Sequence, residues 1–403
     1  MDTIIEQEKC TGCGACNSSC PKEAIRMHTD KEGFDFPFID SSKCIDCGIC
    51  RQVCPPLHYG SRENKRQDEN SVQRGYAARN KNIEERLVSS SGSIFVVLAH
   101  CILLDGGVVV GVAYDTEFNA VYRMITDERD IYQLQGSKYL QCKADKSCFC
   151  QIRNVLKAGR KVLFSGLACQ VEGLRAFLRK DYENLFCVDL ICMGIPSPAV
   201  WQEYLHSYFP NERILEVNFK EKSVGWDHFN LSIKTDKRQF KQWGMENPYF
   251  KSMFNTYNMR RSCFCCPFKN INRAADITLA DCWGASRLVP SINDNKGLSS
   301  VVVHSKKGLS LWQQAASYMD SIELALDDIV RGNTNMIENR SCDWNKRKIF
   351  YRLLHSSHPQ KAFRFAEKQG IERTGILMPY VRKIIKKFLK LLKDEFKKMV
   401  ESA

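Results

Sequence analysis

Two cysteine runs with the same spacing constrain the first sixty residues of this chain. The segment "KCTGCGACNSSCP" occupies residues 9–21, and "KCIDCGICRQVCP" occupies residues 43–55. Each run has the pattern C-x2-C-x2-C-x3-C followed by proline, and the second begins 34 residues after the first. The repeat predicts an internal duplication with pseudo-two-fold symmetry, joined by a hairpin in residues 24–40.

This spacing is typical of paired iron–sulfur clusters. Three thiolates spaced two residues apart wrap three corners of a 4Fe–4S cube, and the fourth thiolate of each run crosses to the other cluster. The alternative is zinc, but zinc sites use isolated C-x2-C pairs with tetrahedral closure, which fits two complete quartets poorly. The stretch resembles bacterial two-cluster ferredoxins. We therefore predict one cluster on Cys10, Cys13, Cys16 and Cys54, and the other on Cys44, Cys47, Cys50 and Cys20.

Cysteine content and charge limit the remaining classes. Twenty cysteines in 403 residues are too many for an average protein, and the chain is too large for a disulfide-stapled scaffold. We see no secretory signal and no run of 18 apolar residues, so we expect a cytoplasmic protein with reduced, metal-binding thiols. The net charge is +13, but the last 22 residues contribute eight basic against three acidic side chains. Without a zinc-finger or RNP-type motif, we expect no nucleic-acid partner.

The rest of the chain alternates apolar strand-like and helix-like segments. This alternation predicts an α/β or α+β fold, with a small ferredoxin-like domain, a larger mixed α/β flavoprotein body and a C-terminal helical tail. Within the body we expect a buried helix in residues 93–104, and a strand, a tight glycine turn and a helix in residues 160–180. Ser197 is expected to cap a helix that begins at Pro198. The expected divisions are 1–58 for the ferredoxin domain, 59–75 for a polar linker, 76–155 and 156–345 for the body, and 346–403 for a basic helical tail.

Four body segments, residues 89–115, 159–178, 189–205 and 260–284, carry a family resemblance when taken in this order. They include "GRKVLFSGLACQVEGLRAFL", "DLICMGIPSPAVWQEYL" and "RRSCFCCPFKNINRAADITLADCWG". Together they resemble the β-subunit family of coenzyme F420 hydrogenases and dehydrogenases, whose coenzyme is a deazaflavin hydride carrier. The resemblance spans about residues 75 to 340 and implies a flavoprotein with FAD. It assigns FAD to the first half of the body, and a third cluster and the active site to the second.

The third cluster needs four thiolates from this region. Cys263 and Cys266 form a C-x2-C pair in the family's matching segment, while Cys169 and Cys192 each follow an apolar strand. Cys265 lies inside the pair and leaves the choice between Cys263, Cys265 and Cys266 open. The alternative for Cys169 and Cys192 is that they are buried small hydrophobes. The chain also departs from the family: "SGLACQ" lacks the usual Thr-Pro, and Met193 stands where a histidine is common.

Flavin contacts are expected where small residues allow close backbone approach to a pyrophosphate. Lys138 would add positive charge near the phosphates or the isoalloxazine ring. The alternative is that the "GGVVVG" stretch is a core strand and that Lys138 is solvated. Asp276 and Asp281 either position a substrate or proton or cap turns. The expected contacts are Ser91, Gly92, Ser93, Gly107, Gly111, Ser137, Lys138 and Tyr139.

The basic tail has two interpretations. From Val381 to Val400, apolar side chains share one face at helical spacing and lysines fill the other. Such a helix lies on an anionic membrane surface or packs on the body or a partner helix, and we favour packing.

These observations predict an iron–sulfur flavoprotein oxidoreductase. Electrons would pass between the ferredoxin clusters and FAD, with hydride exchange to a small molecule such as a deazaflavin coenzyme. The external partner would be a redox protein or a small hydride donor or acceptor. The alternative is an electron-transfer adaptor subunit that serves another enzyme and has no substrate of its own. No catalytic residue is assigned from the sequence.

Overall fold

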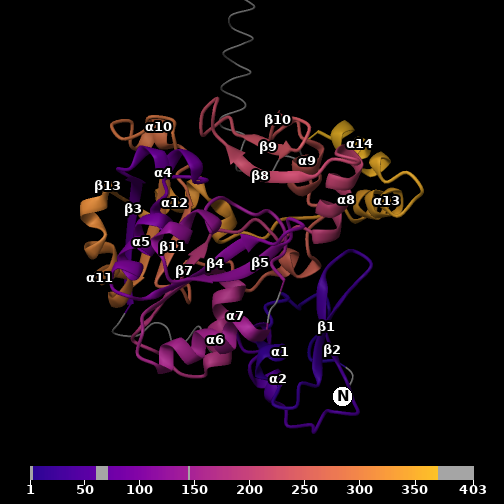
Figure 1. Cartoon of the computed structure of the whole chain (residues 1–403), viewed down its shortest axis with the longest axis horizontal. Coiled ribbons are helices and arrows are strands. Elements are labelled where there is room, and N and C mark those ends of the chain that lie inside the picture. The colour runs from indigo at the N-terminus through magenta and orange to yellow at the C-terminus, as the bar shows by residue number, and fades with distance from the viewer. Residues whose placement is uncertain (1–2, 60–70, 144–145, 371–403) are drawn as a thin grey trace, which may run out of the picture.

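The computed structural model describes residues 3–59, 71–143 and 146–370. These residues form a mixed α/β body and a smaller ferredoxin-like module packed beneath it (Figure 1). Their strands make three sheets, of two, three and eight strands. None of the described helices is both long enough and apolar enough to cross a membrane.

The eight-stranded sheet organises the body. Its strand order is β13-β3-β12-β11-β7-β6-β4-β5, in which neighbours from β11 to β4 run parallel and the other pairs are antiparallel. The parallel strands are almost continuously apolar because helices cover both faces of this part of the sheet. The strands are β3 (Ser71–Asn80), β4 (Val108–Tyr114), β5 (Ala120–Ile125), β6 (Val162–Leu167), β7 (Leu185–Leu190), β11 (Ile277–Asp281), β12 (Ser299–Ser305) and β13 (Met319–Leu324).

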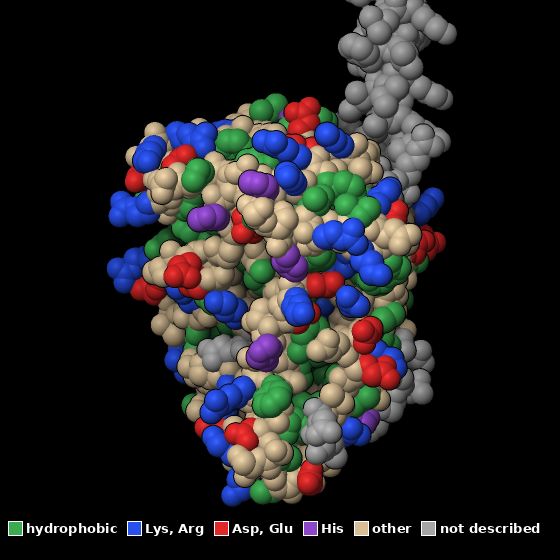
Figure 2. Space-filling view, turned by 90° about the vertical axis from the view of Figure 1, so that its right-hand side faces the viewer, with side chains coloured by type: hydrophobic (Ala, Val, Ile, Leu, Met, Phe, Trp, Pro, Cys, Tyr) green, Lys and Arg blue, Asp and Glu red, His purple; other side chains and the backbone are tan. Residues whose placement is uncertain are grey.

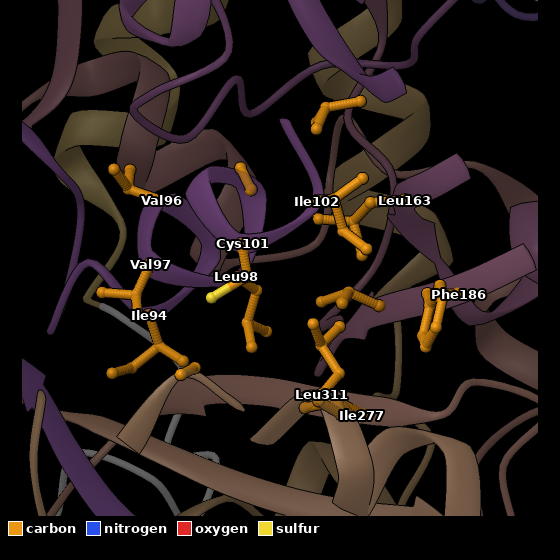
Figure 3. Close-up of a cluster of buried hydrophobic side chains, with 14 of the residues drawn as sticks. Ile94, Val96, Val97, Leu98, Cys101, Ile102, Leu163, Phe186, Ile277 and Leu311 are labelled. Atoms are coloured by element: carbon orange, nitrogen blue, oxygen red, sulfur yellow. The ribbon is translucent and has the colours of Figure 1, made fainter. Parts of the chain in front are cut away.

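Side chains on successive strand residues enter different cores. Leu163 of β6 packs among α5 and α11, whereas its neighbours Val162 and Phe164 pack among α6 and α7 on the opposite face. Figure 3 shows the first core, where Ile102 of α5 lies near Leu163. The buried helix expected in residues 93–104 is therefore confirmed. The covering helices are α5 (Ile94–Leu104), α6 (Lys146–Lys157), α7 (Ala168–Leu178) and α11 (Lys306–Gln314).

A second unit surrounds an aromatic core. Trp201 of α8 packs against Phe219 of β8, and Tyr204 of the same helix packs against Phe363 of α14 within one aromatic core. As expected, Ser197 caps α8: its Oγ accepts a hydrogen bond from Val200 N at 3.3 Å. The elements are β8 (Ile214–Glu221), β9 (Asn230–Thr235), β10 (Gln239–Trp243), α8 (Pro198–Tyr208), α9 (Pro248–Phe254), α13 (Trp344–Leu354) and α14 (Gln360–Lys368).

Short elements complete the body. Helix α12 packs against the β3 side of the large sheet, where Ile329 joins a small core with Val302 and Met336. Helix α10 contributes Ala285 to a neighbouring core with Ala77 and Leu298. These elements are α4 (Ile83–Val88), α10 (Ala285–Leu288) and α12 (Leu326–Gly332), with the 3-10 helices η2 (Glu128–Gln133), η3 (Arg261–Cys265), η4 (Ala316–Tyr318) and η5 (Thr334–Met336).

The ferredoxin-like module has the predicted duplication and hairpin. Helices α1 and α2 each begin directly after a glycine in the left-handed region, Gly14 with φ 81° and Gly48 with φ 69°. Strands β1 and β2 pair antiparallel, from Ile25 opposite Ile39 to Thr29 opposite Asp35. The elements are α1 (Ala15–Ser19), β1 (Ile25–Thr29), β2 (Asp35–Ile39), α2 (Ile49–Gln52) and the 3-10 helix η1 (Pro55–Leu57).

Two expectations require correction. The linker expected over residues 59–75 is too long, because residues 71–75 form the first half of β3; Gly75 pairs with both Val302 and Leu324. Pairing with β12, joined at Gly75 by pairing with β13, overrides the polar composition of this segment. The glycine turn expected between β6 and α7 is also absent. Helix α7 begins at Ala168, directly after the strand, and the Gln170 side chain accepts the Leu167 N–H at 2.7 Å.

The described part of the expected tail is helical, as α13 and α14 show. The segment from Val381 to Val400 lies outside the described residues, so its membrane or packing role stays a prediction. On the face shown in Figure 2, Lys and Arg side chains are interspersed with Asp and Glu. They do not gather there into one continuous basic surface.

The turn of the β1–β2 hairpin docks onto the body. Gly33 has φ +85°, and a Cβ at this position would lie 2.3 Å from Ala199 Cβ and 2.6 Å from Ser197 Oγ. The neighbouring Glu32 forms an ion pair with Arg261 at 3.0 Å, and a second with Arg347. The docking therefore needs both a left-handed turn and a residue without a side chain.

We predict that Gly33→Ala weakens this docking. Gly106→Ala is the matched control, because Gly106 has φ +70° but no atom within 4 Å of its Cβ position. The control should cost about 1–2 kcal/mol from backbone strain alone. Gly33→Ala should cost about 1–3 kcal/mol more from overpacking. Thermal unfolding and hydrogen exchange at the start of α8 measure the difference, and equal effects of the two variants would contradict the docking argument.

Candidate functional site

The eight cysteines of the ferredoxin-like module lie in two groups. Cys44, Cys47 and Cys50 of the second run line one small pocket together with Cys20 of the first run. Conversely, Cys54 of the second run lies within electrostatic range of Cys16 of the first run. Cys10 and Cys13 of the first run lie within the same range of Cys16. The structure thus brings together both crossed quartets expected from the spacing.

The backbone around these groups suits a cluster. Gly12 has φ +68°, and Ala24 N donates a hydrogen bond to Cys20 Sγ at 3.3 Å. Backbone N–H groups directed at sulfur are a standard way in which proteins set cluster potentials. Loss of solvent contact raises the pKa of the half-buried Cys13 and Cys16 thiols, so these side chains need a positively charged partner such as iron to become thiolates.

A third group of thiols lies in the body. Cys169 is in the first turn of α7, directly after β6, and Cys192 follows the end of β7 by two residues. Both line one cavity with Cys263 of η3 and with Cys266. Because β6 and β7 are parallel neighbours, their carboxyl ends deliver Cys169 and Cys192 to the same edge. The predicted quartet is therefore assembled in space.

Cys265 does not line this cavity. It is exposed, and its Sγ faces the carbonyl oxygens of Glu8, at 3.6 Å, and Ser262, at 3.9 Å. Ile195 N instead donates to Cys263 Sγ at 3.3 Å. The geometry therefore favours Cys263 and Cys266 over Cys265.

The third group is buried beside two basic side chains. Burial raises the pKa of the Cys263 thiol to about 12 and that of Cys266 to about 11. Lys269 and Arg273 line the same cavity, and the Lys269 ammonium binds the carbonyl oxygens of Cys192 at 2.5 Å and Asn335 at 2.8 Å. These positive charges suit a group of thiolates.

The spacing of the thiols also matters. Within the described residues, no three His, Cys, Asp or Glu side chains come close enough together to share one metal ion. A cube binds each thiolate at a different iron atom, so its ligands stand further apart than the ligands of a single ion.

A buried polar network that was not predicted from the sequence holds Arg273. Asp189 of β7 is fully buried and accepts a hydrogen bond from Arg273 Nε at 2.8 Å and from Thr278 Oγ1 at 2.5 Å. His304 Nε2 lies 2.7 Å from the same hydroxyl, and burial lowers the pKa of His304 to about 3, so this ring is neutral. The available signal was a carboxylate in the otherwise apolar "LFCVDL" strand.

A larger cavity of about 300 Å³ opens at the carboxyl ends of the parallel strands β4, β6, β7 and β11. Ligands of open α/β sheets commonly bind at this edge. The cavity shares four lining residues with the third thiol group, namely Leu167, Cys192, Gly194 and Ile195. Six of the eight predicted flavin contacts line it: Ser91, Ser93, Gly111, Ser137, Lys138 and Tyr139.

The other two predicted contacts lie elsewhere. Gly107 precedes β4 at the opposite end of the sheet, where a Cβ would lie 2.6 Å from Ile102 O. Gly92 lies behind the lining, and a Cβ there would be 2.4 Å from Ala78 O. Both glycines permit close packing of the backbone, which a sequence pattern does not distinguish from close approach to a ligand.

The start of α5 forms one wall of the cavity. Ser93 directly precedes this helix with φ 63°, and both Ser93 and the first three residues of the helix line the cavity. Ser90 Oγ accepts hydrogen bonds from Ser137 N at 2.6 Å and Ser137 Oγ at 2.8 Å, which joins this wall to the segment that carries Lys138. The free N–H groups at a helix start favour an anion.

Lys138 is the cation of this wall. Its Nζ donates to Gln135 O at 2.6 Å and to Gln133 O at 3.4 Å, and it lies 5.6 Å from the centre of the Tyr114 ring. The Lys138 side chain lines the cavity and is surrounded by protein on its other sides. This burial lowers its pKa to about 7.

The two aspartates around β11 have different surroundings. Asp281, at the carboxyl end, lines the cavity and pairs with the buried Lys220 at 3.2 Å, a partner that was not predicted from the sequence. Asp276, before the amino end, accepts hydrogen bonds from Cys187 N and Ser305 Oγ, both at 2.7 Å. Asp276 therefore ties strands together, whereas Asp281 adjoins the candidate ligand site.

Two family models match parts of this chain. Residues 159–328 match the family model for the C-terminal part of the beta subunit of coenzyme F420 hydrogenase/dehydrogenase, and residues 9–56 match the model of a 4Fe-4S dicluster domain. No curated protein matches the chain.

Among solved structures, one similar chain comes from the xenon-derivatised F420-reducing NiFe hydrogenase complex of Methanosarcina barkeri. The similarity covers 74% of this chain and 91% of that chain, at 16% identity and a TM-score of 0.45. By these two matches, this chain is an iron–sulfur protein with a 4Fe–4S dicluster domain at residues 9–56, and its residues 159–328 are related to the C-terminal part of coenzyme F420 hydrogenase/dehydrogenase beta subunits.

Proposed function

We propose that this chain is an iron–sulfur flavoprotein oxidoreductase with three 4Fe–4S clusters and FAD. The observation that carries the proposal is the shared wall between the third thiol group and the cavity at the strand ends, formed by Leu167, Cys192, Gly194 and Ile195. Bound FAD would supply the conversion between single electrons and a hydride equivalent. The residues around it would bind FAD, orient it and exclude water.

The cavity has the chemistry that a dinucleotide needs. The start of α5, the Ser90–Ser137 hydrogen bonds and Lys138 together favour an anionic pyrophosphate. Apolar side chains, including Val112 and Leu134, line other parts of the cavity and suit a ring system. Asp281 and Lys220 form a charged pair at the strand ends, where a carboxylate can hold a proton or orient a small substrate.

The three thiol groups lie in an order that suits electron transfer. Cys47 is exposed, which places the pocket of Cys20, Cys44, Cys47 and Cys50 near the surface. The group that contains Cys13 packs on α7: a Cβ on Gly173 would lie 3.0 Å from Cys13 Sγ. The same helix carries Cys169 of the third group at its start. A surface group, an intermediate group and a buried group thus lead to the cavity.

We predict that the wild-type protein, purified without oxygen, holds about twelve irons per chain, as three 4Fe–4S clusters require. Cys169→Ser, Cys192→Ser, Cys263→Ser or Cys266→Ser should each lose about four, because each removes one ligand of the third cluster. Iron and sulfide analysis measures the loss. Cys265→Ser and the buried Cys187→Ser are matched controls and should keep the wild-type content. Unchanged iron in a folded Cys192→Ser variant would remove this residue from the ligand set.

We predict that Lys138→Met weakens FAD binding at least tenfold, whereas the exposed Lys143→Met has no effect. A pKa of about 7 means that Lys138 loses its charge as the pH rises through neutrality. Binding to the wild-type protein should therefore be tighter at pH 6 than at pH 8, and this dependence should vanish in Lys138→Met. Titration of the flavin-free protein with FAD tests both points; equal affinities of the two lysine variants would argue against the assignment.

The adaptor alternative makes a different prediction about activity. An oxidoreductase with its own substrate site reduces or oxidises a small molecule by itself, whereas an adaptor is active only with a partner enzyme. The cavity beside Asp281 favours the first, so we expect reduced deazaflavin coenzyme or another small hydride donor to bleach the flavin of the isolated chain. Anaerobic absorbance spectroscopy follows this reaction. Bleaching that requires a second protein would favour the adaptor.

A further inference from the structure

One arginine joins the ferredoxin-like module to the body at full burial. Arg260 donates hydrogen bonds to three neutral acceptors: from Nε to Cys10 O at 2.7 Å, and from its two terminal nitrogens to Gln141 Oε1 and Asp35 O, both at 3.0 Å. Its guanidinium also lies 4.1 Å from the centre of the Phe36 ring. None of the ion pairs among the described residues includes Arg260. A buried cation without a carboxylate partner is costly unless another anion offsets its charge.

The backbone of the same residue is tied to the third thiol group. Arg260 N donates to Ile195 O at 2.8 Å, and Arg260 O accepts from Cys263 N at 3.1 Å. Ile195 N in turn donates to Cys263 Sγ at 3.3 Å. The side chain of Arg260 thus holds the Cys10–Cys13 loop, while its backbone holds the loop that presents Cys263.

The geometry of the Cys10–Cys13 loop depends on this contact. A Cβ on Gly12 would lie 2.6 Å from Gln141 Nε2 and 3.1 Å from a terminal nitrogen of Arg260. The guanidinium also binds the carbonyl oxygen of Cys10, and the backbone carbonyl of Arg260 accepts the N–H of Cys263. One arginine therefore contacts a ligand loop from each of two neighbouring thiol groups.

Two buried hydroxyls flank this contact. Thr11, from the ferredoxin loop, and Ser262, from the body, are 7% and 2% exposed and line the cavity of the third thiol group. Thr11 Oγ1 faces the Cys13 thiol, but neither hydroxyl has a hydrogen-bond partner of good geometry within the described part of the chain. Buried hydroxyls rarely stay without a partner, and cluster sulfurs are acceptors that would satisfy them.

We propose that Arg260 is a positioning residue that fixes the junction for electron transfer between the ferredoxin cluster of Cys10, Cys13, Cys16 and Cys54 and the body cluster, and that raises the reduction potential of both. This inference rests on the proposed function, since it requires a third cluster. The step is the movement of one electron from the reduced cluster to the oxidised one, with no bond formed or broken. Each cluster gains negative charge on reduction, so a nearby fixed cation favours the reduced form of both.

The test is an anaerobic redox titration with dithionite, followed by electron paramagnetic resonance, on the full chain. In Arg260→Met, the equilibrium constant for reduction of both clusters should fall about tenfold, which is about 59 mV for one electron. Arg261→Met is the matched control: the neighbouring arginine is half-exposed and pairs with Glu32, so both potentials should stay at their wild-type values. The signal of the body cluster is identified by its loss in Cys192→Ser.

Ser262→Ala provides a second variant that removes one oxygen atom and preserves the charge. It should lower the potential of the body cluster and leave the iron content unchanged; Ser310→Ala on the exposed face of α11 should do neither. If Arg260→Met fails to fold, Ser262→Ala decides alone. If Arg260→Met binds its full iron content and both clusters keep their wild-type reduction potentials, the proposal is wrong. If Arg260→Met does not fold, a wild-type potential of the body cluster in Ser262→Ala is the result that overturns it. If the wild-type protein holds only about eight irons, the proposed third cluster itself is wrong. The iron content therefore distinguishes failure of the proposed function from failure of this inference.

Discussion

The parallel pairing of β4, β6, β7 and β11 brings four carboxyl ends to one edge of the eight-stranded sheet. Cys169, Cys192 and Asp281 follow or end three of these strands, although up to 112 residues separate them along the chain. The candidate cavity and the third thiol group exist because this pairing collects them. Helices on both faces bury the sheet, so its strand ends are the part left open to a ligand.

Burial then sets the electrostatic character of the site. Cys169 and Cys263 of the third group are buried among apolar side chains and Cys266 is half-buried beside them, so thiolates there require positive charge nearby. Lys269 and Arg273 supply it, and Arg273 is held by Asp189, which also accepts from Thr278. A comparable pair, Lys220 and Asp281, lies at the other cavity. The charged residues of the body thus serve as fixed partners: Lys269 and Arg273 for the third thiol group, and Lys220 for Asp281 at the strand ends.

The ferredoxin-like module is attached through contacts that leave little room for substitution. Gly33 meets α8, Gly173 meets Cys13, and Arg260 spans from the Cys10 carbonyl to the loop of Cys263. These contacts come from three separate regions of the body. They hold the thiol group that contains Cys13 directly against α7, the helix that begins at the third thiol group. Packing therefore fixes the position of the ferredoxin-like module relative to the body.

The sequence by itself determined the hairpin and the α/β class. It also predicted the two crossed quartets and a third thiol group, with the choice among Cys263, Cys265 and Cys266 left open, because local spacing and a strand followed by a cysteine are visible along the chain. It misjudged Gly107, Gly92 and the length of the linker, since the same small or polar residues serve packing, pairing and ligand approach. Only the tertiary structure decided that Cys265 points away, that Asp276 and Asp281 have different surroundings, and that Arg260 joins two thiol groups. These facts depend on which distant segments of the chain pack together, and the spacing of residues along the sequence does not show this.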